Sequence, residues 1–328
     1  MNSPASDRAG HPSPLQEVPG VHDGHGPPDR LTPQRLAEVS ERIAGVVGLD
    51  ATGAHRIKFT NNAVVALPAA AAVIRIAGST TIRHRVPAVI AAARLFADHD
   101  IPAVRLWPGI DQPLRVGHHL ATLWQHTPAG GPAPLPADLA RILHAIHAIR
   151  RTPPAGIPAW RLPARIRQRL LDADGVDTDT VTYLTAELAD LETALARLDD
   201  IAPLLPPGLL HGDAHLGNLI ATPDGPVICD FDSTATGRRE WDLIPAAVGS
   251  HRFGYTPDVH QGLAGAYGLD VMTWPGFDIL RRLREFQLIT SVLPVLGANP
   301  ALRPQWQHRL NTYRTGDTHA RWTPYATT

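Results

Sequence analysis

Residues 211–218 read HGDAHLGN, and residues 229–234 read CDFDST. Two apolar runs, Leu219–Ala221 and Val227–Cys229, lie between these motifs and flank the sequence Thr-Pro-Asp-Gly at 222–225. Proline fixes φ and glycine accepts a positive φ, so this sequence favours a turn. The segment between the two motifs is therefore predicted to be a β-hairpin.

The register of this hairpin brings Asn218 close to Asp230. If Thr222 faces Val227 across the turn, Asn218 falls opposite Phe231, which directly follows Asp230. Paired strands lie about 5 Å apart. The open end of the hairpin is thus expected to collect polar side chains.

Asp213 is expected to join this group, because it precedes the first strand by only a few residues. Two carboxylates and an amide at one point suit the binding of a divalent cation. The alternative is that these residues only shape turns. Asp213 and Asp230 each follow an apolar run, however, where a carboxylate without a function would be costly to bury.

The spacing of His211, Asp213 and Asn218 resembles the protein-kinase catalytic loop H-R-D-x-x-x-x-N. In that loop the Asp accepts the proton of the substrate hydroxyl and the Asn holds Mg²⁺. Asp230-Phe231 matches the first two residues of the kinase D-F-G motif, whose Asp holds the other Mg²⁺.

Two residues differ from the protein-kinase motifs and indicate a particular branch of the kinase-like fold. Gly212 replaces the kinase Arg, and Asp232 replaces the D-F-G glycine. With His215 and Gly217, these residues are similar to the aminoglycoside phosphotransferase and choline kinase branch of the kinase-like fold. The resemblance implies an α+β, two-lobed, protein-kinase-like fold with a small antiparallel-sheet N-lobe and a mostly helical C-lobe that contains the catalytic hairpin.

The same resemblance implies transfer of the γ-phosphoryl group of ATP or GTP to a hydroxyl of a small molecule, an antibiotic or a metabolite. Asp213 would orient and deprotonate the acceptor, Asn218 and Asp230 would hold Mg²⁺, and Asp232 would support a second ion. Three further residues are expected to support the site: His211 to brace the loop, His215 near the phosphates, and Asp242 to anchor the loop by buried hydrogen bonds.

The chain is expected to divide into a disordered tail at 1–30, a nucleotide-binding N-lobe at 31–127, and a catalytic and acceptor-binding C-lobe at 128–328. The tail is rich in Pro, Gly, His, Ser and Asp and has no periodic apolar pattern. The N-lobe pattern predicts a helix from Pro33, strands at 56–59, 63–67, 72–76, 101–107 and 114–123, and a helix at 86–97. The C-lobe pattern predicts helices at 139–149, at 163–200 with a break at 172–179, and at about 256–313.

The expected nucleotide contacts depart from the kinase pattern. Kinases place a Lys on the third strand, paired with a Glu on the next helix. Here the third-strand residue is Arg75, which can also bind phosphate, and no Glu occurs between Glu41 and Glu187. The remaining candidates are Lys58, the only lysine of the chain, the loop residues Asn61 and Asn62, and a hinge at Trp124, Gln125 and His126 that would bind adenine.

Composition excludes several other classes of protein. The 328 residues have a formal net charge of −1, which gives no sign of nucleic-acid binding. No run of 18 apolar residues predicts a membrane span, no apolar segment near residue 1 predicts a signal peptide, and the single cysteine, Cys229, fits a cytoplasmic protein. Either a monomer or a homodimer is compatible with the sequence.

The sequence does not identify the acceptor. Asp258, Asp270, Asp278 and Glu285 could attract a polycation, but three arginines, Arg281, Arg282 and Arg284, lie among them and are interpreted as part of a solvated helix face. Two other functions stay open: a non-catalytic nucleotide-binding protein, which the missing Glu favours, and a transferase that uses another activated donor.

Overall fold

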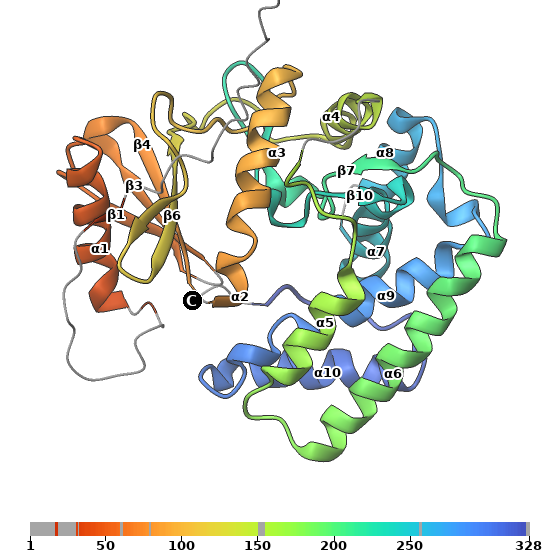
Figure 1. Cartoon of the computed structure of the whole chain (residues 1–328). Coiled ribbons are helices and arrows are strands. Elements are labelled where there is room, and N and C mark those ends of the chain that lie inside the picture. The colour runs from red at the N-terminus through yellow and green to blue at the C-terminus, as the bar shows by residue number, and fades with distance from the viewer. Residues whose placement is uncertain are drawn as a thin grey trace, which may run out of the picture. The chain divides into compact units, whose positions relative to one another are not determined.

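A computed structural model describes residues 17–18, 31, 33–59, 62–78, 80–149, 155–255 and 258–325 (Figure 1). The chain forms two compact units. The first contains the described residues up to Ile90 together with Val104–His126, and the second contains Ala91–Ala103 and the described residues from Thr127 onward. Residues 91–103, expected in the N-lobe, thus group with the second unit.

The first unit is built on a six-stranded sheet in the order β1-β5-β6-β4-β3-β2. Every neighbouring pair is antiparallel except β1 with β5. The strands are β1 (Glu17–Val18), β2 (His55–Phe59), β3 (Asn62–Leu67), β4 (Ala72–Ala77), β5 (Leu114–Val116) and β6 (His119–Gln125).

One face of this sheet is covered by α1 (Pro33–Val46). Leu36, Val39 and Ile43 recur at helical spacing, and they pack in one core with Ile74 and Ile76 of β4. Side chains alternate along a strand, so this core fixes which β4 residues face away from it. A smaller apolar cluster joins α2 (Thr80–Arg83) and α3 (Val86–Asp98) to the end of β4.

Two predicted strands of the N-lobe differ from the structure. Residues 101–107 form only the isolated bridges Ala103 to Ile228 and Leu106 to Trp124. Pro102 removes a backbone donor from the segment, and Pro108 follows directly after it.

The predicted strand at 114–123 is instead a hairpin of β5 and β6. Val116 pairs with His119, and Gly117 takes φ +56°, as a two-residue hairpin turn requires. The predicted tail needs a correction at 17–18, which pair with residues 115–116 as β1. The rest of 1–30 lies outside the described residues.

The second unit is mostly helical. Its helices are α4 (Pro136–Ala148), α5 (Leu162–Leu171), α6 (Thr178–Ala196), α7 (Ile244–Phe253), α8 (Val259–Tyr267), α9 (Phe277–Thr290) and α10 (Arg303–Arg314). Two short antiparallel ribbons lie among them: β7 (Gly208–Leu210) with β10 (Ala235–Gly237), and β8 (Leu219–Ile220) with β9 (Val227–Ile228). In the described part of the chain, no helix is both long enough and apolar enough to cross a membrane.

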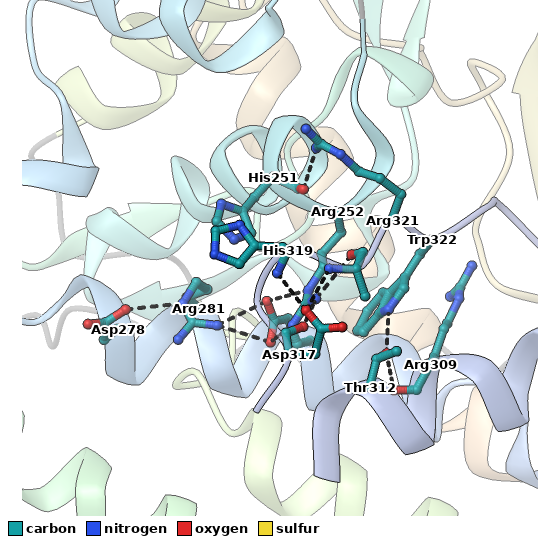
Figure 2. Close-up of polar contacts among 12 residues, drawn as sticks. His251, Arg252, Asp278, Arg281, Arg309, Thr312, Asp317, His319, Arg321 and Trp322 are labelled. Carbon is teal, nitrogen blue, oxygen red and sulfur yellow. Dashed lines mark hydrogen bonds and ion pairs between the residues drawn. The ribbon is translucent and has the colours of Figure 1, made fainter. Parts of the chain in front are cut away.

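A buried ion pair fixes α7 against α9. Arg252 donates to both carboxylate oxygens of Glu285, at 2.8 and 3.0 Å, and each side chain is only 1 % exposed. Arg252 also donates to the Asp317 carbonyl at 2.7 Å and lies over the Trp322 ring. Figure 2 shows this group, in which Arg281 also reaches Glu285. The C-terminal segment is thereby fastened to α7, α9 and α10.

Candidate active site

The loop that follows β7 makes a turn that only glycine fits. Gly212 has φ +84°, a region that L side chains rarely adopt. A Cβ at this position would lie 2.0 Å from the Ser233 carbonyl oxygen. The same close approach explains why Gly212 stands where the kinase loop has Arg. Trp241 donates from Nε1 to the Gly212 carbonyl at 2.9 Å, and this bond fixes the orientation of the peptide that follows Gly212.

Asp242 anchors this loop from beneath. Its carboxylate has no exposed surface and accepts backbone N–H bonds from His211 and Gly212, both at 2.7 Å. His147 of α4 contacts the same carboxylate at 3.0 Å, and its other ring nitrogen lies 2.7 Å from the Tyr267 hydroxyl. A buried carboxylate is stable when such bonds satisfy it. This is the geometry that the predicted supporting role of Asp242 requires.

His211 joins the loop to the second hairpin strand. Its Nε2 lies 3.0 Å from the Cys229 carbonyl, and its Nδ1 lies 3.4 Å from the Asp213 backbone nitrogen. A carbonyl only accepts and a backbone N–H only donates, so Nε2 is the donor and Nδ1 the acceptor in these two contacts. His211 has no exposed surface, and these contacts are the geometry that its predicted role as a brace requires.

Two basic side chains flank the Asp213 carboxylate. Arg284 Nη1 lies 2.7 Å from Oδ1, and His215 Nε2 lies 3.9 Å from Oδ2. Burial pushes the pKa of this carboxyl upward, but Arg284 and, to a smaller extent, His215 outweigh burial and hold the pKa at about 2. The side chain keeps 29 % of its surface exposed, so an ionised oxygen is accessible for an acceptor hydroxyl.

Asn218 contacts Asp213, as the sequence predicts, but on the second hairpin strand it contacts Cys229. Its Nδ2 donates to the Asp213 carbonyl at 2.9 Å, and its own carbonyl accepts the Cys229 N–H at 2.9 Å. Because Ile220 pairs with Val227, Asn218 lies opposite Cys229 rather than Phe231. The expected pairing was wrong by two residues, since the turn closes between Thr222 and Gly225 with Ile220, not Thr222, as the partner of Val227.

Asp230 has an unusual backbone. It lies in the left-handed region at φ +64°, where Asp and Asn are the non-glycine residues best tolerated, and its side chain is exposed. The following short helix brings Asp232 next to it, half-buried. No group of three or more His, Cys, Asp and Glu side chains within the described ranges is arranged to hold a metal ion. An ion at this site would therefore use the Asn218 amide oxygen as well as carboxylates.

The predicted nucleotide contacts belong to the first unit. Arg75 lies on β4 between Ile74 and Ile76, which have no exposed surface, and Arg75 is half-buried on the opposite face. Lys58 is exposed on β2, beside a register shift in its pairing with β3. Asn62 begins β3 and is half-buried, whereas Asn61 lies outside the described residues.

The backbone N–H groups of the predicted hinge already donate hydrogen bonds within the first unit. The N–H of Gln125 donates to the Arg105 carbonyl at 2.9 Å, and that of His126 donates to the Ala71 carbonyl at 2.8 Å. Trp124 is 7 % exposed and donates from its ring to Thr122 at 2.8 Å. These backbone donors would have to change partners to bind a base.

The sequence interpretation of the α9 arginines is wrong for Arg284. Arg284 is 9 % exposed and pairs with Asp213, and Glu285 beside it is buried against Arg252. Only Arg282 keeps substantial exposure, at 44 %, in a pair with Glu187. The apolar neighbours Leu280, Leu283 and Phe286 on the same helix are buried, and they show that this part of α9 is enclosed.

The fold and the anchored loop define a kinase-like phosphotransferase. Residues 56–286, more than half of the chain, match the family model described as the phosphotransferase enzyme family, APH, and the chain belongs to this family. It is a small-molecule phosphotransferase. No curated protein matches the sequence.

Solved structures confirm the kinase-like fold. Choline kinase LicA from Streptococcus pneumoniae matches with a TM-score of 0.60 and 12 % identity, covering 86 % of this chain and 99 % of that one. The GDP and kanamycin complex of APH(2")-IIia matches with a TM-score of 0.57 and 14 % identity, covering 85 % of this chain and 98 % of that one. Spectinomycin phosphotransferase APH(9)-Ia, in complex with ADP and spectinomycin, matches with a TM-score of 0.51 and 17 % identity, covering 84 % of this chain and 92 % of that one.

Proposed function

We propose that this phosphotransferase uses ATP or GTP with Mg²⁺ as its donor and phosphorylates a hydroxyl of a small molecule. Asp213 is proposed as the residue that binds this hydroxyl. The observation that supports this most directly is the anchored loop. Asp242 fixes the two residues that precede Asp213, and Asn218 bonds to its carbonyl. Similar structures that contain GDP or ADP support a nucleotide donor. The lone cysteine, Cys229, agrees with a cytoplasmic location.

Asp213 orients the acceptor and receives its proton. The acceptor oxygen forms a bond to the γ-phosphorus, the bond to the β,γ-bridging oxygen breaks, and its electron pair leaves with the nucleoside diphosphate. The acceptor proton passes to the Asp213 carboxylate. A pKa of about 2 makes this carboxylate a weak base, but a loose transition state needs orientation more than early proton removal.

Asn218, Asp230 and Asp232 fit the ligand chemistry of Mg²⁺. Oxygen ligands are what this hard cation prefers, and Asp230 and Asp232 supply them as carboxylates. Asn218 uses its amide nitrogen on the Asp213 carbonyl, which leaves its amide oxygen as the donor atom. When bound, the ion would neutralise charge on the phosphate oxygens.

Arg75 is proposed to contact the donor phosphates. It is the basic residue on β4 that faces away from the sheet core, and a guanidinium binds phosphate through two parallel N–H bonds. Lys58 is the alternative cation, and Asn62 begins the strand that follows the predicted nucleotide loop.

Incubation of the purified full chain with Mg²⁺ and ATP or GTP tests the function. Acceptors from a panel of antibiotics, sugars, amino alcohols and nucleosides should give a phosphorylated product and a nucleoside diphosphate in equal amounts by mass spectrometry. Binding of both nucleotides without product from any acceptor would favour the non-catalytic alternative. Product formation that needs neither nucleotide would point to another activated donor.

A further inference from the structure

Arg284 is a buried cation placed where the acceptor must bind. Its Nη1 lies 2.7 Å from Asp213 Oδ1, and the same nitrogen donates to Gln287 Oε1 at 2.8 Å. A hydroxyl that is to lose its proton to Asp213 must approach to about 2.6–3.2 Å. Because Oδ1 is buried, the acceptor hydroxyl would bind at Oδ2, on the same carboxylate that this guanidinium contacts.

One edge of the guanidinium has no hydrogen-bond partner among the described residues. A guanidinium has five N–H donors in a planar fork, and both bonds of Arg284 come from Nη1. Within the described residues, Nε and Nη2 donate to no side chain or backbone carbonyl. The pair of nitrogens that binds a carboxylate or phosphate in a bidentate manner thus has no partner in the described part of the chain.

Two arginines of α5 lie near the same group of residues. Arg165 donates to the Ser233 hydroxyl at 3.1 Å, and Arg169 donates to the Gln287 carbonyl at 3.4 Å. They are one turn apart, so they share one face of the helix. Guanidinium groups of α5 and α9 therefore lie beside Asp213, Ser233 and Gln287, and no carboxylate of α9 balances Arg284, because Glu285 pairs with Arg252.

We infer that the acceptor is an alcohol that also bears an oxyanion, a carboxylate or a phosphate, and that Arg284 binds this group through Nε and Nη2. The inference rests on the proposed role of Asp213 as the acceptor base. Nη1 stays on Asp213, so one guanidinium aligns the acceptor and its base. A polycationic acceptor would place positive charge against Arg284 and is disfavoured at this site.

Matched acceptors test this inference in the full chain with Mg²⁺ and ATP or GTP. Glycerate is compared with glyceramide, and glycerol 3-phosphate with glycerol, and kanamycin represents the polycations. We expect kcat/KM for at least one anionic member to exceed that of its neutral partner by about tenfold or more, and the two pairs separate carboxylate from phosphate recognition. A neutral acceptor or kanamycin as the best substrate would overturn the inference.

Arg284→Gln should raise KM for the anionic acceptor by about tenfold or more while KM for the nucleotide stays the same, and Arg284→Lys should recover part of the loss. Arg282→Gln is the matched control, because Arg282 is on the same helix but is 44 % exposed and pairs with Glu187. An unchanged KM for the anionic acceptor in Arg284→Gln would contradict the inference.

A binding titration keeps the test independent of turnover. With ADP and Mg²⁺ saturating the donor site, glycerate and inorganic phosphate are titrated into the wild type and both Gln variants. Binding of at least one anion that is weakened about tenfold only in Arg284→Gln supports the inference, and absence of binding to the wild type rejects it. If Arg284 binds the anion but no acceptor is ever phosphorylated, the proposed function fails and the anion site stands.

Discussion

The guanidinium of Arg284 lies 2.7 Å from the carboxylate of Asp213, across 71 residues of sequence. This pair keeps Asp213 ionised at every pH at which the protein is expected to work, because its pKa of about 2 is below the ordinary value of 3.8. The pKa of the candidate base is thus lowered chiefly by a residue of α9, with a smaller contribution from His215 of its own loop.

Removal of Arg284 should change the pH dependence of the protein. Folding lowers the pKa of Asp213, so the ionised carboxylate stabilises the folded protein. This stabilisation of the fold is present above pH 3.8 and is lost as the pH falls toward 2. In Arg284→Gln, burial should raise this pKa, and the acid limb of kcat/KM should move to higher pH. Rate profiles of both proteins measure this shift, and coincident acid limbs would show that Asp213 does not set them.

Asp213→Asn should retain the fold and nucleotide binding and lower kcat by about 10²–10⁴, the usual range for a positioned acid–base group. The amide keeps the shape of the side chain but cannot accept the proton. Asp190→Asn, on the exposed face of α6, is the control. Wild-type turnover in purified Asp213→Asn would remove this residue from the mechanism.

Asp230→Asn should abolish Mg²⁺-dependent nucleotide binding, because the anionic ligand is lost while Asn still tolerates the left-handed backbone at φ +64°. Asn218→Ala should weaken binding less, because it removes a neutral oxygen and one bond to the Asp213 carbonyl. Calorimetric titration with Mg-nucleotide ranks the variants. An affinity of Asp230→Asn equal to that of the wild type would reject the metal assignment.

Arg75→Ala should weaken nucleotide binding by about 1.5–3 kcal/mol, the range for hydrogen bonds to charged groups, and Arg75→Lys should restore part of it. Lys58→Ala is the comparison, since Lys58 is exposed on β2. If Lys58→Ala strongly weakens nucleotide binding in the same titration and Arg75→Ala leaves it unchanged, the phosphate contact belongs to the nucleotide loop. Two silent variants would favour the non-catalytic alternative.

Gly212→Ala should destabilise the protein and disrupt activity, because its Cβ would lie 2.0 Å from the Ser233 carbonyl oxygen. Gly225→Ala provides a matched control: it also has a positive φ, +106°, but nothing lies within 4 Å of its Cβ. Urea unfolding of both variants separates the steric effect from backbone strain. Equal losses would mean that the contact with Ser233 relaxes at little cost.

The sequence alone predicted the parts of the site that follow from short-range pattern. The turn at Thr222–Gly225, the two strands beside it and the place of Asn218 near the Asp213 loop all depend on residues within about twenty positions. The register was wrong by two residues, because the turn residues did not indicate that Ile220, rather than Thr222, pairs with Val227.

The long-range partners could not be predicted from pattern. Arg284 is one of three arginines at helical spacing, and only tertiary packing makes it buried while Arg282 is exposed. His147 lies beside buried apolar residues of α4, yet it contacts Asp242 from 95 positions away. Its spacing from Ile146 and Leu143 gives no sign of a polar partner, since both apolar residues are buried as the pattern suggests.

The hydrogen bonds of Asp242 have a consequence for how the loop opens. The amides of His211 and Gly212 donate to a carboxylate that α4 also holds through His147, and α8 holds His147 through Tyr267. These two amides can exchange with solvent deuterium only when the loop separates from the helices that enclose it. The rate of their exchange should therefore follow global unfolding, whereas the surface hairpin turn at Thr222–Gly225 exchanges early.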